Sequence, residues 1–222
     1  MIGMNKEGTP TSEILIDDEI IARILHGEKD LYSIIVRRYN QRLYRVGMSI
    51  INDDVEVEDA MQVAYINAYE NLGKFGFRSS FPTWLTRILI NECLLRLRKR
   101  KKSISMNDEN MENVMRQNKE PRTPVTATVN SELRSILNDA IRKLPEIYRT
   151  VFVMREIENM NISETKECLN ISEVNVKVRL NRAKALLRDI LSTQYSKEDI
   201  LHFHLSRCDR MVEKVMTGIR DL

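Results

Sequence analysis

The residues best suited to chemistry lie in one segment of the C-terminal half, and the chemistry they suit is nucleic-acid binding. Residues 163–191 are predicted to form a short helix, a tight turn beginning at Asn170 and a longer helix, which is the pattern of a helix-turn-helix. Arg and Lys suit guanine edges and phosphates, and Asn suits adenine. The candidate contact residues are Ser172, Glu173, Asn175, Lys177, Arg179, Asn181, Arg182 and Lys184. A helical hairpin with a solvated basic face is the alternative interpretation.

A second concentration of cations follows a group of aromatic residues. Six of the seven residues from Arg96 to Lys102 are basic, and four of the six Phe and Trp residues of the chain lie within 75–84. Rings that stack on bases, next to cations that hold phosphates, suit a single-stranded nucleic acid. The candidate residues are Phe81, Trp84, Asn91, Arg96, Arg98, Lys99 and Arg100. For Phe81 and Trp84, burial in a protein core is the alternative.

An acidic segment precedes these two features. Residues 51–72 contain six Asp or Glu and no Lys or Arg, although the whole chain has a formal net charge of only +3. Charge segregated in this way predicts two surfaces whose partners carry opposite charge. A solvated helix face is again the alternative for the acidic segment.

Three residues near the C-terminus suggest metal chemistry. His202, His204 and Cys208 give an H-x-H-x3-C pattern, but Met211 stands where a fourth ligand is needed. A structural zinc ion requires four nitrogen or sulfur ligands. We therefore expect no metal and no other cofactor, and we expect the amphipathic helix of residues 197–219 to pack on the preceding domain.

Helices are expected to position all of these residues. Apolar residues recur at helical spacing, and no strand alternation competes with it, so the sequence predicts an all-α fold. The expected parts are a tail (1–12), a four-helix domain (13–102), a flexible linker (103–129), a helix-turn-helix domain (130–191) and a C-terminal helical extension (192–222).

The composition predicts a cytoplasmic protein. Its three cysteines, Cys93, Cys168 and Cys208, are widely spaced and odd in number, which does not suit a disulfide framework and favours a reducing compartment. The longest apolar runs are four residues, so we expect no segment that spans a membrane. The N-terminus has no apolar core of a secretory signal.

Three segments together resemble a known family. They are VEDAMQVAYINAYENLGKF (57–75), RSSFPTWLTRILINECLLRLRKRKK (78–102) and the segment from Leu144 to Arg188. In order and spacing, the chain resembles the extracytoplasmic-function (ECF, group IV) sigma factors of bacterial RNA polymerase, which belong to the sigma-70 superfamily. The resemblance covers about residues 15–191. It implies a sigma-2-like four-helix domain and a sigma-4-like helix-turn-helix domain.

The resemblance implies a promoter-specificity subunit that is not itself an enzyme. Glu58, Asp59 and Gln62 match the surface that docks on the clamp helices of the largest polymerase subunit. Residues 79–90 match the part that helps to open the promoter, and residues 91–102 match the helix that reads the −10 element. The helix from Ser172 matches the −35 reader, and the linker would follow the RNA-exit path. The implied partners are core RNA polymerase (clamp helices and flap), promoter DNA and an anti-sigma factor, and the free protein would be a monomer.

The chain departs from the family pattern at three positions. Pro82 replaces the usual Arg, Asn170 replaces the usual Gly of the turn, and Glu173 begins the recognition helix. These departures leave open which −35 bases are read. Glu173 would either accept a hydrogen bond from cytosine or repel phosphate.

Two other classes of protein compete with this interpretation. A dimeric helix-turn-helix regulator would bind palindromic DNA without polymerase. An enzyme is disfavoured because the sequence has no P-loop, G-x-S-x-G or H-E-x-x-H motif and no acidic cluster near a His.

Overall fold

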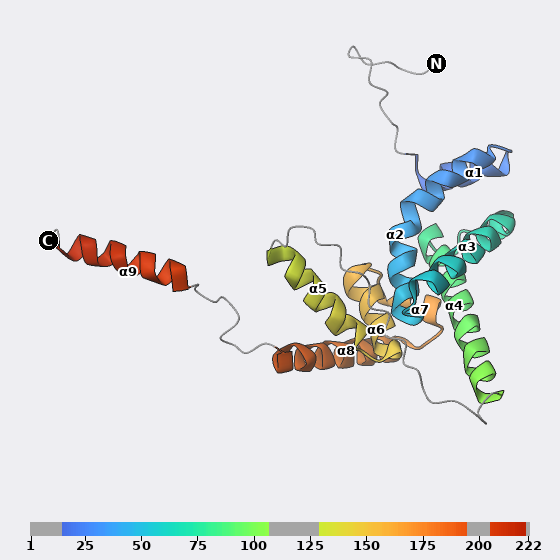
Figure 1. The fold of residues 1–222 in the computed structure, drawn as a ribbon. Coiled ribbons are helices and arrows are strands. Elements are labelled where there is room, and N and C mark those ends of the chain that lie inside the picture. The colour runs from blue at the N-terminus through green and yellow to red at the C-terminus, as the bar shows by residue number, and fades with distance from the viewer. Residues whose placement is uncertain (1–14, 107–128, 195–204, 221–222) are drawn as a thin grey trace, which may run out of the picture.

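The computed structural model describes residues 15–106, 129–194 and 205–220, and every regular element within these ranges is helical. This confirms the predicted all-α class (Figure 1). The α-helices are α1 (Asp17–Leu25), α2 (Tyr32–Ile50), α3 (Asp54–Glu70), α4 (Phe81–Met106), α5 (Val129–Arg142), α6 (Glu146–Phe152), α7 (Ile162–Leu169), α8 (Glu173–Gln194) and α9 (Leu205–Arg220). Two 3-10 turns, η1 (Lys29–Leu31) and η2 (Leu72–Lys74), and a π-helical turn, η3 (Val153–Ile157), complete the list.

Helices α1 to α4 form the first helical unit. The apolar side chains of α3 from Val57 to Ala68 are buried, and the helix packs against α2 and α4. The helix starts after Asp53, because the side chain of Asp53 accepts a hydrogen bond from the backbone N–H of Glu56 (3.0 Å) and thereby caps the first turn. This unit holds most of the buried apolar side chains.

Helices α5 to α8 form the second helical unit. Helix α7 begins with a capping box, in which Asn161 and Glu164 satisfy each other's backbone N–H groups (2.9 and 2.7 Å). It ends at Asn170, which has left-handed backbone angles (φ 51°, ψ 50°). Asn tolerates this conformation better than most residues, so it can replace Gly in the turn before α8.

The two units pack directly on each other in the described residues. Helix α7 contacts α4, and α6 and η3 contact α2. Met154, Met160 and Cys168 of the second unit belong to the same buried cluster as the core of the first unit. The pattern of apolar residues along the chain predicted each unit but not this shared core.

The predicted C-terminal helix is present as α9, but it does not pack on the second unit as expected. Its side chains from Arg210 to Thr217 are exposed, including the apolar Met211, Val212, Val215 and Met216. The expectation that this helix packs on the second unit is therefore wrong for these residues. His202 and His204 lie outside the described residues, and so does the side chain of Cys208.

Gly47 allows α2 and α3 to approach closely. A Cβ atom added to Gly47 would lie 2.8 Å from Cγ1 of Val57, and Val57 is fully buried. We expect Gly47→Ala to lower the free energy of unfolding by about 1 kcal/mol, since overpacking costs ~1–3 kcal/mol and alanine recovers about 1 kcal/mol of helix propensity. Urea unfolding measures this change. Gly73→Ala is the control, because its nearest neighbour would be 3.8 Å away, and a G47A protein as stable as the wild type would contradict the prediction.

Candidate nucleic-acid and protein interfaces

Helices α7 and α8 form the predicted helix-turn-helix. Val176 and Ala183 of α8 are fully buried and face inward, since α8 packs on α6, α7 and α5. Of the eight candidate residues, the following have exposed side chains at the start of α8 or along it: Ser172, Asn175, Lys177, Asn181 and Arg182. The exposed arc of α8 thus presents amides and cations, the groups that bind base edges and phosphates.

Two candidate residues of α8 form ion pairs within the protein, and a third is half-buried. Glu173 forms an ion pair with Lys166 of α7 (2.8 Å), and this hydrogen bond lowers the pKa of Glu173. Lys184 pairs with Glu156 of η3 (3.0 Å). Arg179 is half-buried and lines a small cavity with Ile90 and other apolar residues of the first unit. DNA would have to compete with these contacts.

The aromatic cluster divides into buried and exposed rings. Phe81 is only 2% exposed and packs edge-on against Phe75, so the prediction that Phe81 stacks on a base is wrong for this conformation. Trp84 is half-buried beside the same two rings. Phe77 is 60% exposed and has a positive φ of 54°. Phe77 was not among the predicted site residues, although it belongs to the same aromatic segment.

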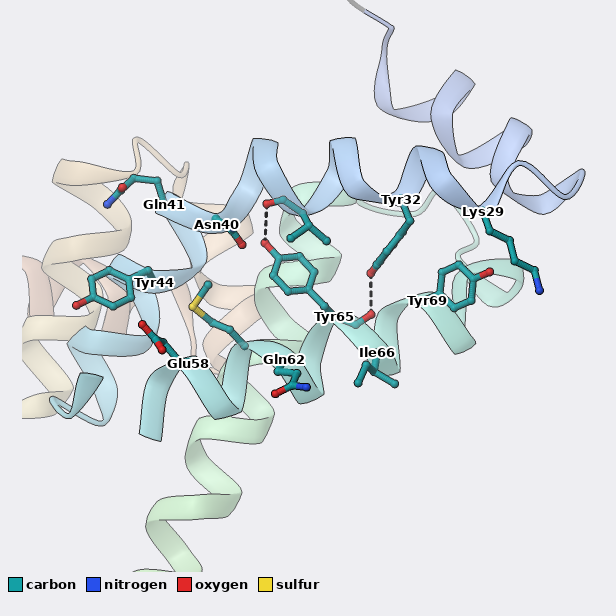
Figure 2. Close-up of a pocket in the computed structure, with 12 residues that line it drawn as sticks. Lys29, Tyr32, Asn40, Gln41, Tyr44, Glu58, Gln62, Tyr65, Ile66 and Tyr69 are labelled. Atoms are coloured by element: carbon teal, nitrogen blue, oxygen red, sulfur yellow. Dashed lines mark hydrogen bonds between the residues drawn. The ribbon is translucent and has the colours of Figure 1, made fainter. Parts of the chain in front are cut away.

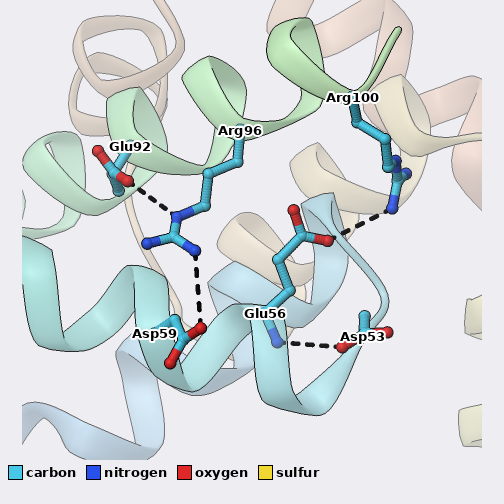
Figure 3. A network of polar contacts seen from close by, with 6 residues as sticks. All are labelled: Asp53, Glu56, Asp59, Glu92, Arg96 and Arg100. Atoms are coloured by element: carbon cyan, nitrogen blue, oxygen red, sulfur yellow. Dashed lines mark hydrogen bonds and ion pairs between the residues drawn. The ribbon is translucent and has the colours of Figure 1, made fainter. Parts of the chain in front are cut away.

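The basic residues of α4 lie close to the acids of α3, as Figure 3 shows. Arg96 donates to Glu92 (2.8 Å) and lies 4.0 Å from Asp59. Arg100 pairs with Glu56 (3.4 Å). Asn91, Arg98 and Lys99 are exposed, and the side chains of Lys101 and Lys102 lie outside the described residues. The basic surface and the acidic surface predicted from sequence therefore share a border of ion pairs.

This border predicts a measurable effect on binding to single-stranded DNA. Glu56→Gln releases Arg100, and an exposed pair is worth about 0.5 kcal/mol, so we expect about twofold tighter binding. Fluorescence anisotropy with a labelled single-stranded oligonucleotide measures the affinity. Glu58→Gln is the matched control, because it removes the same charge from the same helix at an exposed residue. Equal affinities of E56Q and E58Q for the oligonucleotide would show that the ion pair between Glu56 and Arg100 does not weaken DNA binding.

The three predicted docking residues of α3 lie together on one exposed face. Glu58, Asp59 and Gln62 are all exposed and are spaced by three and four residues, which places them on adjacent turns of one helix face. Glu58 and Gln62 also line an open groove of about 870 Å³ between α2 and α3 (Figure 2). A hydrogen bond from Tyr32 Oη to the carbonyl of Tyr65 (2.7 Å) spans the groove.

Aromatic and apolar side chains form much of this groove. Tyr65 Oη donates to the carbonyl of Val36 (3.2 Å), and burial raises the pKa of Tyr32 and of Tyr65, which keeps both phenols neutral. Ile66 is 51% exposed at the edge of the groove. An apolar floor beside the carboxylates of Glu58 and the neighbouring, exposed Asp59 suits a protein helix that carries basic residues.

The sequence did not indicate a role for Arg149. This residue is 8% exposed, and its Nε donates to the carbonyl of Ser49 at the end of α2 (2.7 Å). Its Nη1 donates to the carbonyls of Arg142 (2.8 Å) and Leu144 (3.4 Å). Burial lowers the pKa of Arg149. The one signal in the sequence is that Arg149 lies four residues before the buried Val153 and hence on the same helix face.

No metal site or membrane span is found in the described part of the chain. Residues 15–106, 129–194 and 205–220 contain no cluster of three His, Cys, Asp or Glu that would hold a metal ion. Within the same ranges, none of the helices combines the length and the hydropathy needed to cross a bilayer. Cys93 and Cys168 are buried, and burial raises the pKa of each thiol to about 12, so both are poor nucleophiles.

Comparisons with known proteins agree with the two-unit division. Residues 35–103 match the family model described as Sigma-70 region 2, and residues 134–187 match the model described as Sigma-70, region 4. The chain is 32% identical over 173 residues to the ECF RNA polymerase sigma factor SigW of Bacillus subtilis (strain 168), which covers 76% of this chain and 92% of SigW. It is 27% identical over 173 residues to the RNA polymerase sigma-H factor of Pseudomonas aeruginosa, with 76% and 90% covered.

Two solved structures have a similar fold. One is the sigma factor RpoE in complex with the anti-sigma factor NepR from Bartonella quintana, with a TM-score of 0.58, 16% identity and coverage of 74% of this chain and 98% of that chain. The other is CnrH in complex with the cytosolic domain of CnrY, with a TM-score of 0.56, 20% identity and coverage of 79% and 97%.

Proposed function

Because the chain belongs to the extracytoplasmic-function class of the sigma-70 family and is a sigma subunit of RNA polymerase, we propose how its surfaces divide the work of initiation. The exposed arc of α8 reads duplex DNA at the −35 element. The end of α4, with Asn91, Arg98 and Lys99, engages the −10 element as the strands separate. The subunit positions the catalytic enzyme and carries out no chemistry of its own.

The observation that carries the −35 assignment is the exposed arc of α8 on a capped helix-turn-helix. The geometry supports Lys177 and Arg182 as the leading cations, since both are exposed, although Arg182 also donates to the hydroxyl of Tyr148 (3.2 Å). Arg179 and Lys184 would contribute after their present contacts are released. For the −10 element, Trp84 and Phe77 replace Phe81 as the rings near enough to the surface to meet an unstacked base.

The acidic face of α3 is the proposed docking surface for core polymerase. Glu58 and Gln62 line a groove with an apolar floor, and Asp59 is exposed next to Glu58 on the same helix. This surface suits the clamp helices of the largest subunit, while the second unit would meet the flap. We also propose that an anti-sigma factor regulates the chain, because one structure of similar fold is the sigma factor RpoE bound to the anti-sigma factor NepR. As a polymerase subunit, the protein would act in the cytoplasm.

Transcription in vitro with purified core RNA polymerase tests the proposal. We expect specific start sites on genomic fragments only when this protein is added. An Asp59→Ala/Gln62→Ala variant is expected to lose co-elution with core polymerase, whereas a Lys143→Ala variant, changed at an exposed residue after α5, is expected to retain it. A footprint on palindromic DNA without polymerase would favour the dimeric regulator and overturn the proposal.

A further inference from the structure

Two valines lie at the centre of the exposed arc of α8. Val174 is 69% exposed and Val178 is 41% exposed. They are four residues apart, which places them on adjacent turns of one helix face. Because successive residues are about 100° apart around a helix, this face lies opposite the fully buried Val176 and Ala183. The side of α8 that points away from the protein core is therefore apolar at its centre.

The packing of the fold does not account for these two valines. Single exposed apolar residues are common on protein surfaces, but Val174 and Val178 are neighbours on one face. Within the part of the chain that the structure describes, neither belongs to a buried cluster or packs against one. Valine is also a weaker helix former than alanine or lysine. The two positions thus lower helix propensity without contributing to the core, which favours a contact outside the chain.

Polar and charged side chains surround the two valines. Lys177 and Arg182 are exposed on opposite sides of them, each within about a quarter-turn of the helix, and the exposed Asn181 lies next to them. The acid at the start of the helix, Glu173, is paired with Lys166 of α7 (2.8 Å), so its charge is compensated. An apolar strip between cations matches the major groove of DNA, where base edges lie between two rows of phosphates.

We propose that Val174 and Val178 contact thymine methyl groups in the −35 element and thereby select A·T pairs there. The C5-methyl group of thymine is the apolar group that marks an A·T pair in the major groove. Asn181 follows Val178 by three residues and would bind adenine in the same pair or the next one. Residues four apart rise about 6 Å along a helix, and base pairs stack about 3.4 Å apart. The two methyl groups would therefore lie about two base steps apart.

This inference rests on the proposed function, because it requires α8 to lie in the major groove at −35. Its test begins with the full chain bound to core RNA polymerase and a pool of promoters randomised at the −35 element. Selection for initiation is expected to yield A·T pairs within this element. The thymines of the selected element are then replaced by deoxyuridine, which lacks only the methyl group. Transcription in vitro should fall about fourfold for each methyl group that contacts a valine.

Variants of the chain show whether the valines are responsible for this loss. In the Val174→Ala/Val178→Ala variant, thymine and deoxyuridine promoters are expected to initiate equally well, because alanine is too short to reach the methyl groups. Val55→Ala is the matched control, since it shortens a 72% exposed valine of α3 in the same way, and it should keep the fourfold preference. Deoxyuridine placed between the −35 and −10 elements is the DNA control and should leave initiation unchanged.

The possible results separate this inference from the proposed function. If selection yields no preferred −35 sequence, α8 is not the −35 reader and both fail. If a sequence is selected but it lacks A·T pairs, or deoxyuridine initiates as well as thymine, the −35 assignment stands and the role of the valines fails. The same holds if the double alanine variant keeps the wild-type preference for thymine. If that variant instead loses co-elution with core polymerase and keeps the preference, the valines contact the polymerase and not DNA.

Discussion

Arg149→Leu is expected to lower the free energy of unfolding by about 3 kcal/mol. The change leaves buried carbonyl acceptors without a donor, and each unsatisfied acceptor costs ~1–3 kcal/mol. The carbonyls of Arg142 and Leu144 lose the donor that the guanidinium provides. The carbonyl of Ser49 keeps a second hydrogen bond from Thr150 Oγ1 (3.2 Å), so its loss is smaller. Urea unfolding followed by circular dichroism measures the effect.

Two variants show whether charge or geometry stabilises this contact. Arg149→Lys keeps the charge but loses the planar fork that reaches several acceptors, so we expect an intermediate loss of stability. Arg188→Leu, at an exposed residue, is expected to change the free energy of unfolding by less than about 0.5 kcal/mol. If R149L unfolds at the same urea concentration as the wild type, the contact between Arg149 and α2 does not stabilise the protein.

The second large effect is expected on α8. Replacing Lys177 and Arg182 together with alanine should reduce initiation at −35-dependent promoters by tenfold or more, since each base or phosphate contact is worth ~1–3 kcal/mol. If both side chains bind phosphates, the slope of log affinity against log salt should fall by roughly 0.9 per contact. Transcription in vitro with core polymerase over a range of salt concentrations gives both quantities.

A matched variant separates this effect from a general loss of charge. Lys143→Ala removes one cation from an exposed residue of the second unit, outside the helix-turn-helix. We expect it to leave initiation and the salt slope unchanged. If the double variant at Lys177 and Arg182 also behaves like the wild type, the exposed arc of α8 is not the −35 reader.

The sequence predicted the helices and the helix-turn-helix well because both depend on local signals. The apolar stripe of α3 and the Asp53 cap lie within one helix and its first turn. The turn at Asn170 needs one residue that tolerates a positive φ, and the preceding helix α7 has its capping box at Asn161 and Glu164. Such features require no knowledge of distant segments.

The sequence failed where the outcome depends on contacts between distant segments. Phe81 resembles an exposed stacking residue in the sequence, but the rings of Phe75 and Trp84 enclose it. Arg149 binds a carbonyl one hundred residues earlier in the chain. Arg96 and Arg100 form a simple cationic run in the sequence, yet acids of α3 lie beside them only after α3 and α4 have packed.

The fully buried apolar side chains that the second unit contributes to the shared core all contain sulfur: Met154, Met160 and Cys168. Thioether side chains are unbranched and polarizable and fill irregular gaps, whereas the branched Ile20, Ile35 and Val46 that dominate the first unit need a closely matched neighbour. At these positions the interface therefore tolerates small shifts in packing better than the interior of either unit does.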